Sequence, residues 1–141
     1  MMRQDSRLSR VLHALLHLDR MDAPATSELI ATMLQTNPAV VRRTMAGLRD
    51  AGMVTSTKGH GGGWSLAKPL NEIALLDVYQ ALGSPPLFLI GNDEEEPSCL
   101  LARAANNATS LALDHARKQF ENSLASISVA QLTKDWRPDM A

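Results

Sequence analysis

The sequence NPAVVRRTMAGLRDAGMVTSTKGHGGGWSLAKP, residues 37–69, decides the fold of this chain. Asn37 is a favoured helix N-cap, and Pro38 suits the first helical position, where its missing N–H costs nothing. Gly52 supplies the left-handed residue that ends the helix. A glycine-rich loop follows, with short strand-like runs on both sides. A helix followed directly by such a hairpin is the layout of a winged helix-turn-helix.

Two further helices are expected before this stretch. Apolar residues recur at helical spacing over residues 5–19, which predicts a helix with one buried stripe. Thr26 is placed to cap a second helix that ends near Gln35, and Pro24 lies in the turn before it. Because only about three residues separate this helix from the next, the two must cross at a steep angle, as in a helix-turn-helix.

The segments after the third helix complete the expected domain. Two short strands are predicted at residues 53–57 and 64–67, and Pro69 ends the hairpin. A fourth helix is predicted over residues 75–82, and Gly83 stops it.

The C-terminal part is dominated by residues 98–126, which contain neither proline nor glycine. As one helix they would extend about 40 Å, longer than the core of such a domain requires, so we expect the helix to pair with a second chain. Asn106, Asn107 and Thr109 leave open a break into two helices. The stripe expected at the dimer seam consists of Leu113, Ala116, Phe120, Leu124 and Ile127.

The composition agrees with a mainly α protein that has a small β-hairpin wing. The chain has 141 residues, of which 45% are hydrophobic and 4% aromatic, so we expect one domain held together by aliphatic packing. We divide it into a winged helix-turn-helix domain (1–82), an acidic, proline-containing loop (83–97), a dimerisation helix with a short C-terminal turn (98–132) and a tail (133–141).

The formal net charge of -1 hides an asymmetry along the chain. Residues 1–70 contain nine basic and five acidic groups, whereas residues 71–141 contain five basic and ten acidic groups. The first part is therefore +4 and the second -5. This distribution places a phosphate-compatible surface in the N-terminal half and keeps the C-terminal half away from DNA. The acidic run at 93–96 is most simply a solvated loop, and the alternative is that it repels DNA and so sets which face docks.

Several classes of protein are disfavoured by the sequence. No apolar run approaches the roughly 20 residues that a membrane-spanning helix needs, so we expect a cytoplasmic protein. Cys99 is the single cysteine, which excludes an internal disulfide and a metal site built from several thiolates of one chain. We do not expect an enzyme, because no Ser, Cys or carboxylate constellation with a recognisable base motif is present.

Base-reading side chains of a helix-turn-helix come from the N-terminal part of its second helix. The candidates at that position are Thr36, Asn37, Ala39, Arg42 and Arg43. An arginine fork can hydrogen-bond guanine O6 and N7 together, and a helix N-terminus can bind a phosphate. A solvated helix face is the alternative interpretation of the two arginines, but the adjoining hairpin favours DNA.

In the wing, Lys58 and His60 are the candidate contact residues. The glycines around them let the backbone approach a sugar-phosphate edge or enter a minor groove. Such a loop could instead hold a nucleotide phosphate, but the nucleotide motifs need a strand that leads directly into a helix. A second alternative is a protein-interaction module in which Arg42 and Arg43 dock an acidic partner.

Two further features of the sequence have a chemical interpretation. His13 and His17 stand four residues apart on the first helix and can in principle share a metal ion. No third ligand lies nearby, so ordinary imidazoles are favoured and no metal site is predicted. Cys99 could act as a redox switch through an intersubunit disulfide, although a small buried residue is the favoured interpretation.

These motifs resemble the Rrf-two family of bacterial winged-helix regulators, the group that includes IscR, NsrR and CymR. The resemblance is carried by the helix and wing quoted above and by EIALLDVYQAL at residues 72–82, and it extends more loosely to Leu132. It implies a homodimer in which each chain offers one winged helix to one half of a near-palindromic operator. It also implies that the long C-terminal helix forms the dimer seam.

The resemblance assigns roles to individual residues. The recognition-helix contacts of the family fall on Asn37, Arg42 and Arg43, and the basic residue that enters the minor groove falls on Lys58, where many relatives have arginine. The family's sensing branch binds an iron-sulphur cluster through three cysteines. Because this chain offers only Cys99, we predict no three-cysteine cluster and no other cofactor.

The sequence therefore predicts a dimeric, sequence-specific DNA-binding transcriptional regulator, with repression as its expected mode of action. Its expected partners are double-stranded DNA and a second copy of itself. The protein-interaction module and the redox-sensing repressor that uses Cys99 stay open as alternatives. The sequence names neither the operator nor an effector.

Overall fold

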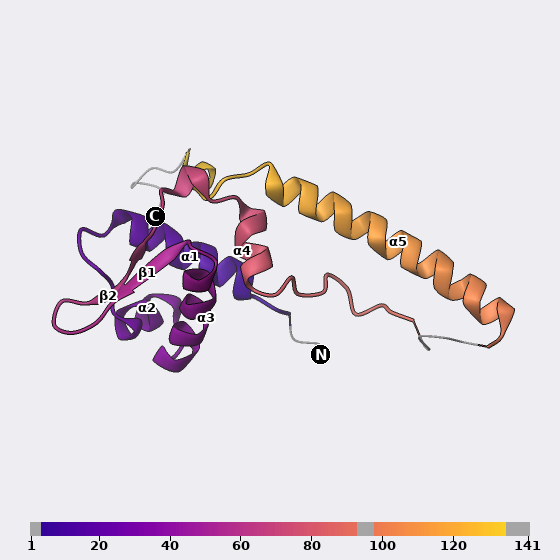
Figure 1. Cartoon of the computed structure of the whole chain (residues 1–141), viewed down its shortest axis with the longest axis horizontal. Helices are drawn as coiled ribbons and strands as arrows, with labels where there is room; N and C mark the ends of the chain where they lie inside the picture. Colours follow the sequence, from indigo (N-terminus) through magenta and orange to yellow (C-terminus); the bar gives the residue numbers. More distant parts are fainter. Residues whose placement is uncertain (1–3, 93–97, 135–141) are drawn as a thin grey trace.

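In the computed structural model, which describes residues 4–92 and 98–134, three helices lead into a two-stranded hairpin and one long helix extends from the body (Figure 1). The helices are α1 (Arg7–Arg20), α2 (Ser27–Leu34), α3 (Pro38–Asp50), α4 (Leu75–Ala81) and α5 (Leu100–Ala125). The strands are β1 (Val54–Thr57) and β2 (Gly63–Leu66), and η1 (Leu70–Glu72) and η2 (Val129–Thr133) are short 3-10 helices. The predicted mainly α fold with a small hairpin wing is confirmed.

The helix ends follow local signals in the sequence. The hydroxyl of Thr26 accepts a hydrogen bond from the backbone N–H of Leu29 at 3.1 Å and so caps α2. The side-chain oxygen of Asn37 caps α3 in the same way, by accepting from the N–H of Val40 at 3.0 Å. Gly52 follows α3 with a φ of 82°, a left-handed conformation that favours glycine. All three predicted caps are confirmed.

The hydrophobic core lies among α1, α2, α3, the hairpin and α4, at the end of the molecule opposite the tip of α5 (Figure 1). Its largest fully buried side chains are Leu15, Ile30, Met45, Leu48, Met53, Val54, Ile73, Val78 and Val129. Because the apolar face of each short helix is buried in this common core, packing stabilises helices that would be marginal in isolation.

The chain returns to this core after α5. The N–H of Val129 donates to the carbonyl of Ile73 at 2.8 Å, and the N–H of Leu75 donates to the carbonyl of Ile127 at 2.9 Å. The short turn predicted at 128–132 therefore forms, as η2, and it packs against the winged helix-turn-helix rather than beside α5.

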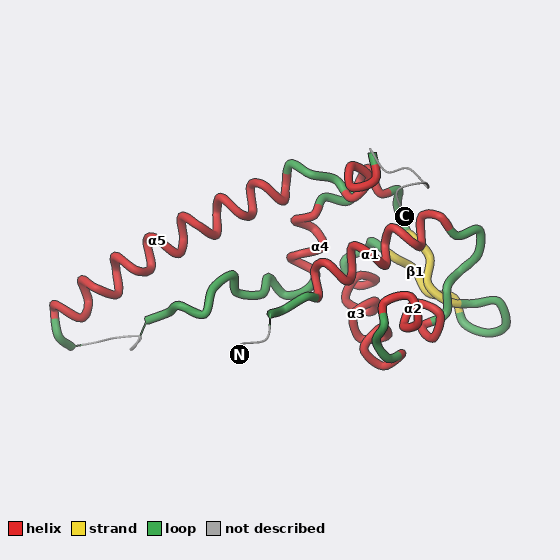
Figure 2. The backbone as a smooth tube through the Cα atoms, turned by 180° about the vertical axis from the view of Figure 1, so that it is seen from behind, coloured by secondary structure: helices red, strands yellow, loops and turns green. Residues whose placement is uncertain are grey.

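The long helix is continuous through the segment where a break had been left open. Thr109 satisfies its hydroxyl within the helix, by donating to the carbonyl of Ala105 at 2.9 Å. All 26 residues of α5 are described, and Leu124 alone among them is buried. Figure 2, drawn from behind, shows α5 reaching away from the body. Within the described ranges, no helix combines the length and the apolar character that crossing a membrane requires.

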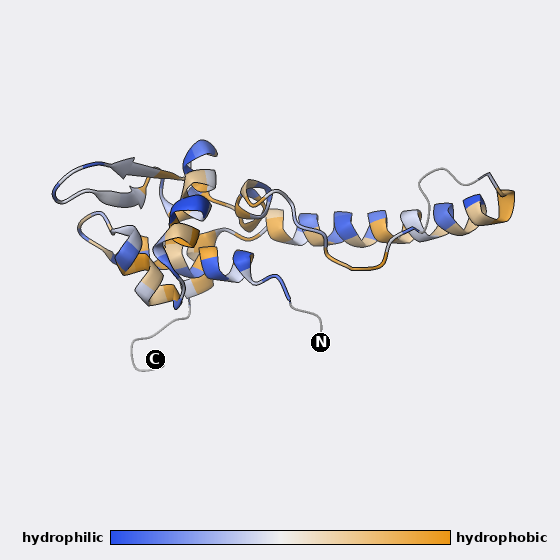
Figure 3. Ribbon diagram, turned by 90° about the horizontal axis from the view of Figure 1, so that it is seen from below, coloured by the Kyte–Doolittle hydropathy of each residue, from blue (hydrophilic) through white to orange (hydrophobic). Residues whose placement is uncertain are grey.

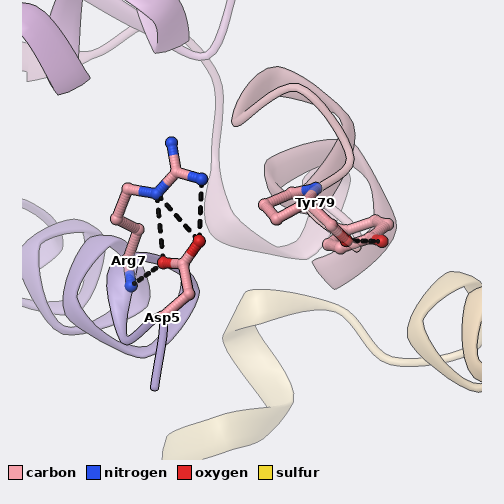
Figure 4. A network of polar contacts seen from close by, with 4 residues as sticks. Asp5, Arg7 and Tyr79 are labelled. Atoms are coloured by element: carbon pink, nitrogen blue, oxygen red, sulfur yellow. Dashed lines mark hydrogen bonds and ion pairs between the residues drawn. The ribbon is translucent and has the colours of Figure 1, made fainter. Parts of the chain in front are cut away.

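The linker, residues 83–92, leaves the body beside α4 and runs along α5. The hydroxyl of Tyr79 donates to the carbonyl of Pro85, as Figure 4 shows together with the Asp5–Arg7 ion pair at the start of α1. Farther along, the side-chain amide of Asn92 donates to the hydroxyl of Ser110 in α5 at 3.0 Å. Hydrogen bonds at both ends therefore fix the course of the linker.

The acidic run at 93–96, interpreted as a solvated loop, lies outside the described residues.

Candidate nucleic-acid interface

The N-terminal half of α3 presents the predicted base-reading residues on an exposed face. Asn37, Ala39, Arg42 and Arg43 are exposed, and Thr36 is half-buried. The opposite face of the helix is buried through Val41, Met45 and Leu48. The alternation follows the helical period, so burying the apolar stripe forces both guanidinium groups toward solvent.

The turn that aims α3 depends on the conformation of Gln35, the residue near which the second helix was predicted to end. Gln35 has a φ of 55°, in the left-handed region that residues other than glycine rarely adopt. The following N–H, of Thr36, donates to the carbonyl of Ala31 at 2.9 Å and closes the end of α2. The chain thus reverses sharply within three residues, which is the predicted helix-turn-helix connection.

The two adjacent arginines differ in their surroundings. Arg42 Nη1 lies 3.7 Å from Glu28 Oε1 in the first turn of α2, and both side chains are more than half exposed. Arg43 has no ion pair among the described residues. In the absence of DNA, therefore, a carboxylate is positioned to compete with phosphate or base for Arg42 but not for its neighbour.

The wing is a short antiparallel hairpin. Val54 pairs with Leu66 at its base, and Thr57 pairs with Gly63 at the last position before the loop. Lys58 and His60 follow in the loop, and both are exposed. A cationic side chain at such a tip can reach a groove or backbone without displacing any part of the core.

The wing is attached to the turn between α1 and α2 through Trp64, near the loop end of β2. The N–H of Trp64 donates to the carbonyl of Ala25 at 2.8 Å, and the N–H of Ala25 donates back to the carbonyl of Trp64 at 2.9 Å. The indole N–H of Trp64 also donates to the hydroxyl of Ser27, at 3.0 Å in a buried position. β2 thus pairs on both sides, and its buried indole fixes the wing to the N-terminus of α2.

Arg49 connects the far end of α3 to the same tryptophan. Its guanidinium carbon lies 5.9 Å from the centroid of the Trp64 ring, within the range of a cation–π contact. The Nε atom of Arg49 also lies 3.6 Å from Asp50 Oδ1. No pattern in the sequence predicts this contact, because Trp64 belongs to another element.

The candidate residues therefore fall into two groups on neighbouring elements. Thr36, Asn37, Ala39, Arg42 and Arg43 belong to α3 and the turn before it, while Lys58 and His60 belong to the wing loop. Both elements lie at the end of the molecule away from the tip of α5 (Figure 1). That all seven contact DNA stays a prediction.

The residues predicted at the dimer seam are partly used within the chain itself. Leu124 is buried in the core, and the ring of Phe120 meets the Tyr79 ring edge-on, with the centroids 5.4 Å apart. Leu113 lines a groove beside the linker, and Ala116 is half-buried. Their role between two chains stays a prediction.

Other apolar side chains near α5 are left uncovered. They are Leu100, Leu101 and Leu111 on the helix and Phe88, Leu89 and Ile90 on the linker. Figure 3 shows the hydrophobic part of the linker along α5. A surface of this kind on a single chain is typical of a protein interface.

The structure corrects the favoured interpretation of Cys99. Its thiol is exposed rather than buried, because it lies just before the uncovered first turn of α5. Hydrogen bonds from the backbone N–H groups of Ala102 and then Leu101 lower the pKa of the thiol. The redox switch that this cysteine could provide stays a prediction.

The fold and the exposed cations of α3 and the wing define a winged helix-turn-helix protein. The family model described as Rrf2, iron-dependent transcriptional regulator, matches residues 4–135, and the chain belongs to this family. The protein is a DNA-binding transcriptional regulator, as the sequence predicted. Its membership therefore favours DNA over an acidic protein as the partner of the exposed arginines.

Individual relatives agree with this assignment. YwnA of Bacillus subtilis, designated an HTH-type transcriptional regulator, is 35% identical over 125 residues, which cover 89% of this chain and 92% of YwnA. A crystal structure designated a DNA-binding protein matches with a TM-score of 0.74 at 32% identity, covering 92% of this chain and all of the other. IscR of T. potens shares the fold, with a TM-score of 0.69 at 22% identity over 99% of this chain and 92% of IscR.

The family description names iron, and an iron site would require a suitable set of metal-binding side chains in this chain. Only one of the 141 residues is a cysteine. In the described part of the chain, no group of three or more His, Cys, Asp or Glu side chains is placed to hold a metal ion. A cluster held by three thiolates of one chain does not fit this set of ligands.

The attachment of the wing predicts a specific sensitivity at Gly63. A Cβ atom at this position would lie 2.5 Å from the carbonyl oxygen of Ala25, so Gly63→Ala must disrupt the pairing of Ala25 with Trp64. We expect a loss of about 2 kcal/mol or more in the free energy of unfolding, measured by urea denaturation. Gly91→Ala is the control, since nothing lies near its Cβ, and it should change stability by less than about 0.5 kcal/mol. Equal stability of the two variants would show that the contact between β2 and Ala25 does not stabilise the fold.

The ion pair between Glu28 and Arg42 predicts that loss of the carboxylate strengthens DNA binding. Glu28→Gln removes the carboxylate that competes for Arg42, so affinity for duplex DNA of random sequence should rise about two- to five-fold at low salt, the size expected of an exposed ion pair. Fluorescence anisotropy measures this directly. Glu72→Gln, an exposed site on η1, makes the same change in net charge and should have a smaller effect. Equal gains for the two variants would show that only the total charge matters.

Proposed function

We propose that this regulator works as a homodimer that binds a near-palindromic operator and represses transcription by occupying promoter DNA in the cytoplasm. Each chain supplies one α3 and one wing to one half-site. A dimer with twofold symmetry places two recognition helices in successive major grooves, about one helical turn apart. RNA polymerase is then excluded from the DNA that the dimer covers.

The observation that supports the dimer is the uncovered N-terminal half of α5. Leu100, Leu101 and Leu111 are 75%, 82% and 67% exposed, on a helix that extends away from its own core. Exposed leucines at this density are costly in water, and a second chain packed along the helix would bury them. Leu113 lies farther along the same helix and would extend this contact.

The DNA contacts divide by chemistry. Arg42 and Arg43 are directed at base edges, because a guanidinium can pair with guanine through two hydrogen bonds. Asn37 uses its side-chain oxygen for the helix cap, which leaves its amide N–H groups for a phosphate. Lys58 acts from the wing as a point charge, since lysine lacks the planar fork of arginine.

The different roles of Arg42 and Lys58 predict that their alanine variants lose DNA binding in different ways. Arg42→Ala should cost about 1–3 kcal/mol of operator binding and relax the sequence preference, because it removes base hydrogen bonds. Lys58→Ala should weaken binding evenly across sequences and flatten its salt dependence, because it removes a phosphate contact. Anisotropy titrations against operator and scrambled duplexes at several salt concentrations separate the two.

Lys134→Ala, at the exposed C-terminal end of η2, is the matched control and should bind like the parent. Unchanged operator affinity in both the Arg42 and the Lys58 variant would refute these assignments.

A further inference from the structure

Two histidines on α1 are brought together at their ring edges. His13 and His17 lie one helical turn apart, and their Nε2 atoms are 2.9 Å from each other. The ring centroids are 4.7 Å apart, with the planes tilted by 45°. Both nitrogens therefore converge on one place beside the helix. The transcriptional function described above makes no use of this pair.

Solvent can reach the two rings. His13 is exposed and His17 is half-buried, so neither is enclosed in the core. Without a metal, the distance fits a hydrogen bond in which one ring donates its N–H and the other accepts. One Nε2 atom is then unprotonated and accepts the hydrogen bond. Once the other Nε2 atom loses the bridging proton, both nitrogens can bind the same metal ion.

The spacing of the nitrogens suits one coordination geometry. Imidazole nitrogens bind divalent metals at about 2.0–2.1 Å, so two that occupy neighbouring corners at a right angle lie about 2.9 Å apart. The observed separation of 2.9 Å equals this distance, and each ring needs only to turn so that its nitrogen faces the ion. Right-angled nitrogen ligands are typical of Cu²⁺ and Ni²⁺, and imidazole suits both.

We propose that His13 and His17 form a two-nitrogen binding site for a divalent transition-metal ion, tightest for Cu²⁺ and next for Ni²⁺. Water completes the coordination, because among the described residues no third His, Cys, Asp or Glu joins the pair. The ion bridges one turn of α1, from His13 to His17. The site is separate from Cys99, and it does not depend on the proposed repressor function.

The chain provides its own controls. His60 lies in the wing loop and His115 on α5, and neither makes a ring contact with another histidine within the described ranges. Each can supply a single imidazole, whereas the α1 pair supplies two from one rigid turn. The second nitrogen of the pair binds intramolecularly, which raises the affinity without any further contact.

The test is calorimetric titration of the full-length, untagged protein with NiCl₂, which does not oxidise the thiol. We expect His13→Gln and His17→Gln each to weaken the tightest Ni²⁺ site by about ten-fold or more, and His60→Gln and His115→Gln to leave it unchanged. Circular dichroism confirms that each variant is folded. His13 is exposed, so its variant serves even if the His17 variant is destabilised.

Two further readouts identify the ligands. Ni²⁺ should raise the Tm of the parent but not that of the His13 variant, because binding to the folded state alone stabilises it. With Cu²⁺ in a Cys99→Ser background, electron paramagnetic resonance should show two nitrogen ligands in the parent and fewer in the variant. Less than a ten-fold loss in the His13 variant, or an equal loss in the His60 or His115 variant, would overturn the proposal.

Discussion

The double pairing between Trp64 and Ala25 is the constraint on which the interface depends. A two-stranded hairpin is marginally stable alone in water, and the wing has only four residues in each strand. Hydrogen bonds to the turn before α2, together with the buried indole on Ser27, make the hairpin part of the helix-turn-helix body. The strands of the wing are consequently held in place beside the N-terminus of α2.

Local signals made much of the fold predictable. Thr26, Asn37 and Gly52 each act on neighbouring residues, so their sequence patterns indicate where α2 begins and where α3 begins and ends. Contacts between distant segments left no such signal. Ser27 and Trp64 are 37 residues apart, and nothing in their spacing predicts that they meet.

In the candidate site, too, local features were predictable from the sequence and contacts between distant segments were not. The exposure of Arg42 and Arg43 follows from the helical period of α3, but the approach of Glu28 depends on how α2 crosses α3. The burial of residues along α5 was harder to predict, because the two ends of this helix lie in different surroundings. Its C-terminal end packs on α4, so Leu124 is buried, whereas its N-terminal end is free, so Leu100 and Cys99 are exposed.

A selection of bound sequences from random duplexes tests most directly whether a dimer reads DNA through α3 and the wing. The structure and the proposed dimer predict one enriched motif, made of two inverted half-sites whose centres lie about one helical turn apart. Enrichment of a single, non-repeated site, or of no sequence at all, would contradict the account.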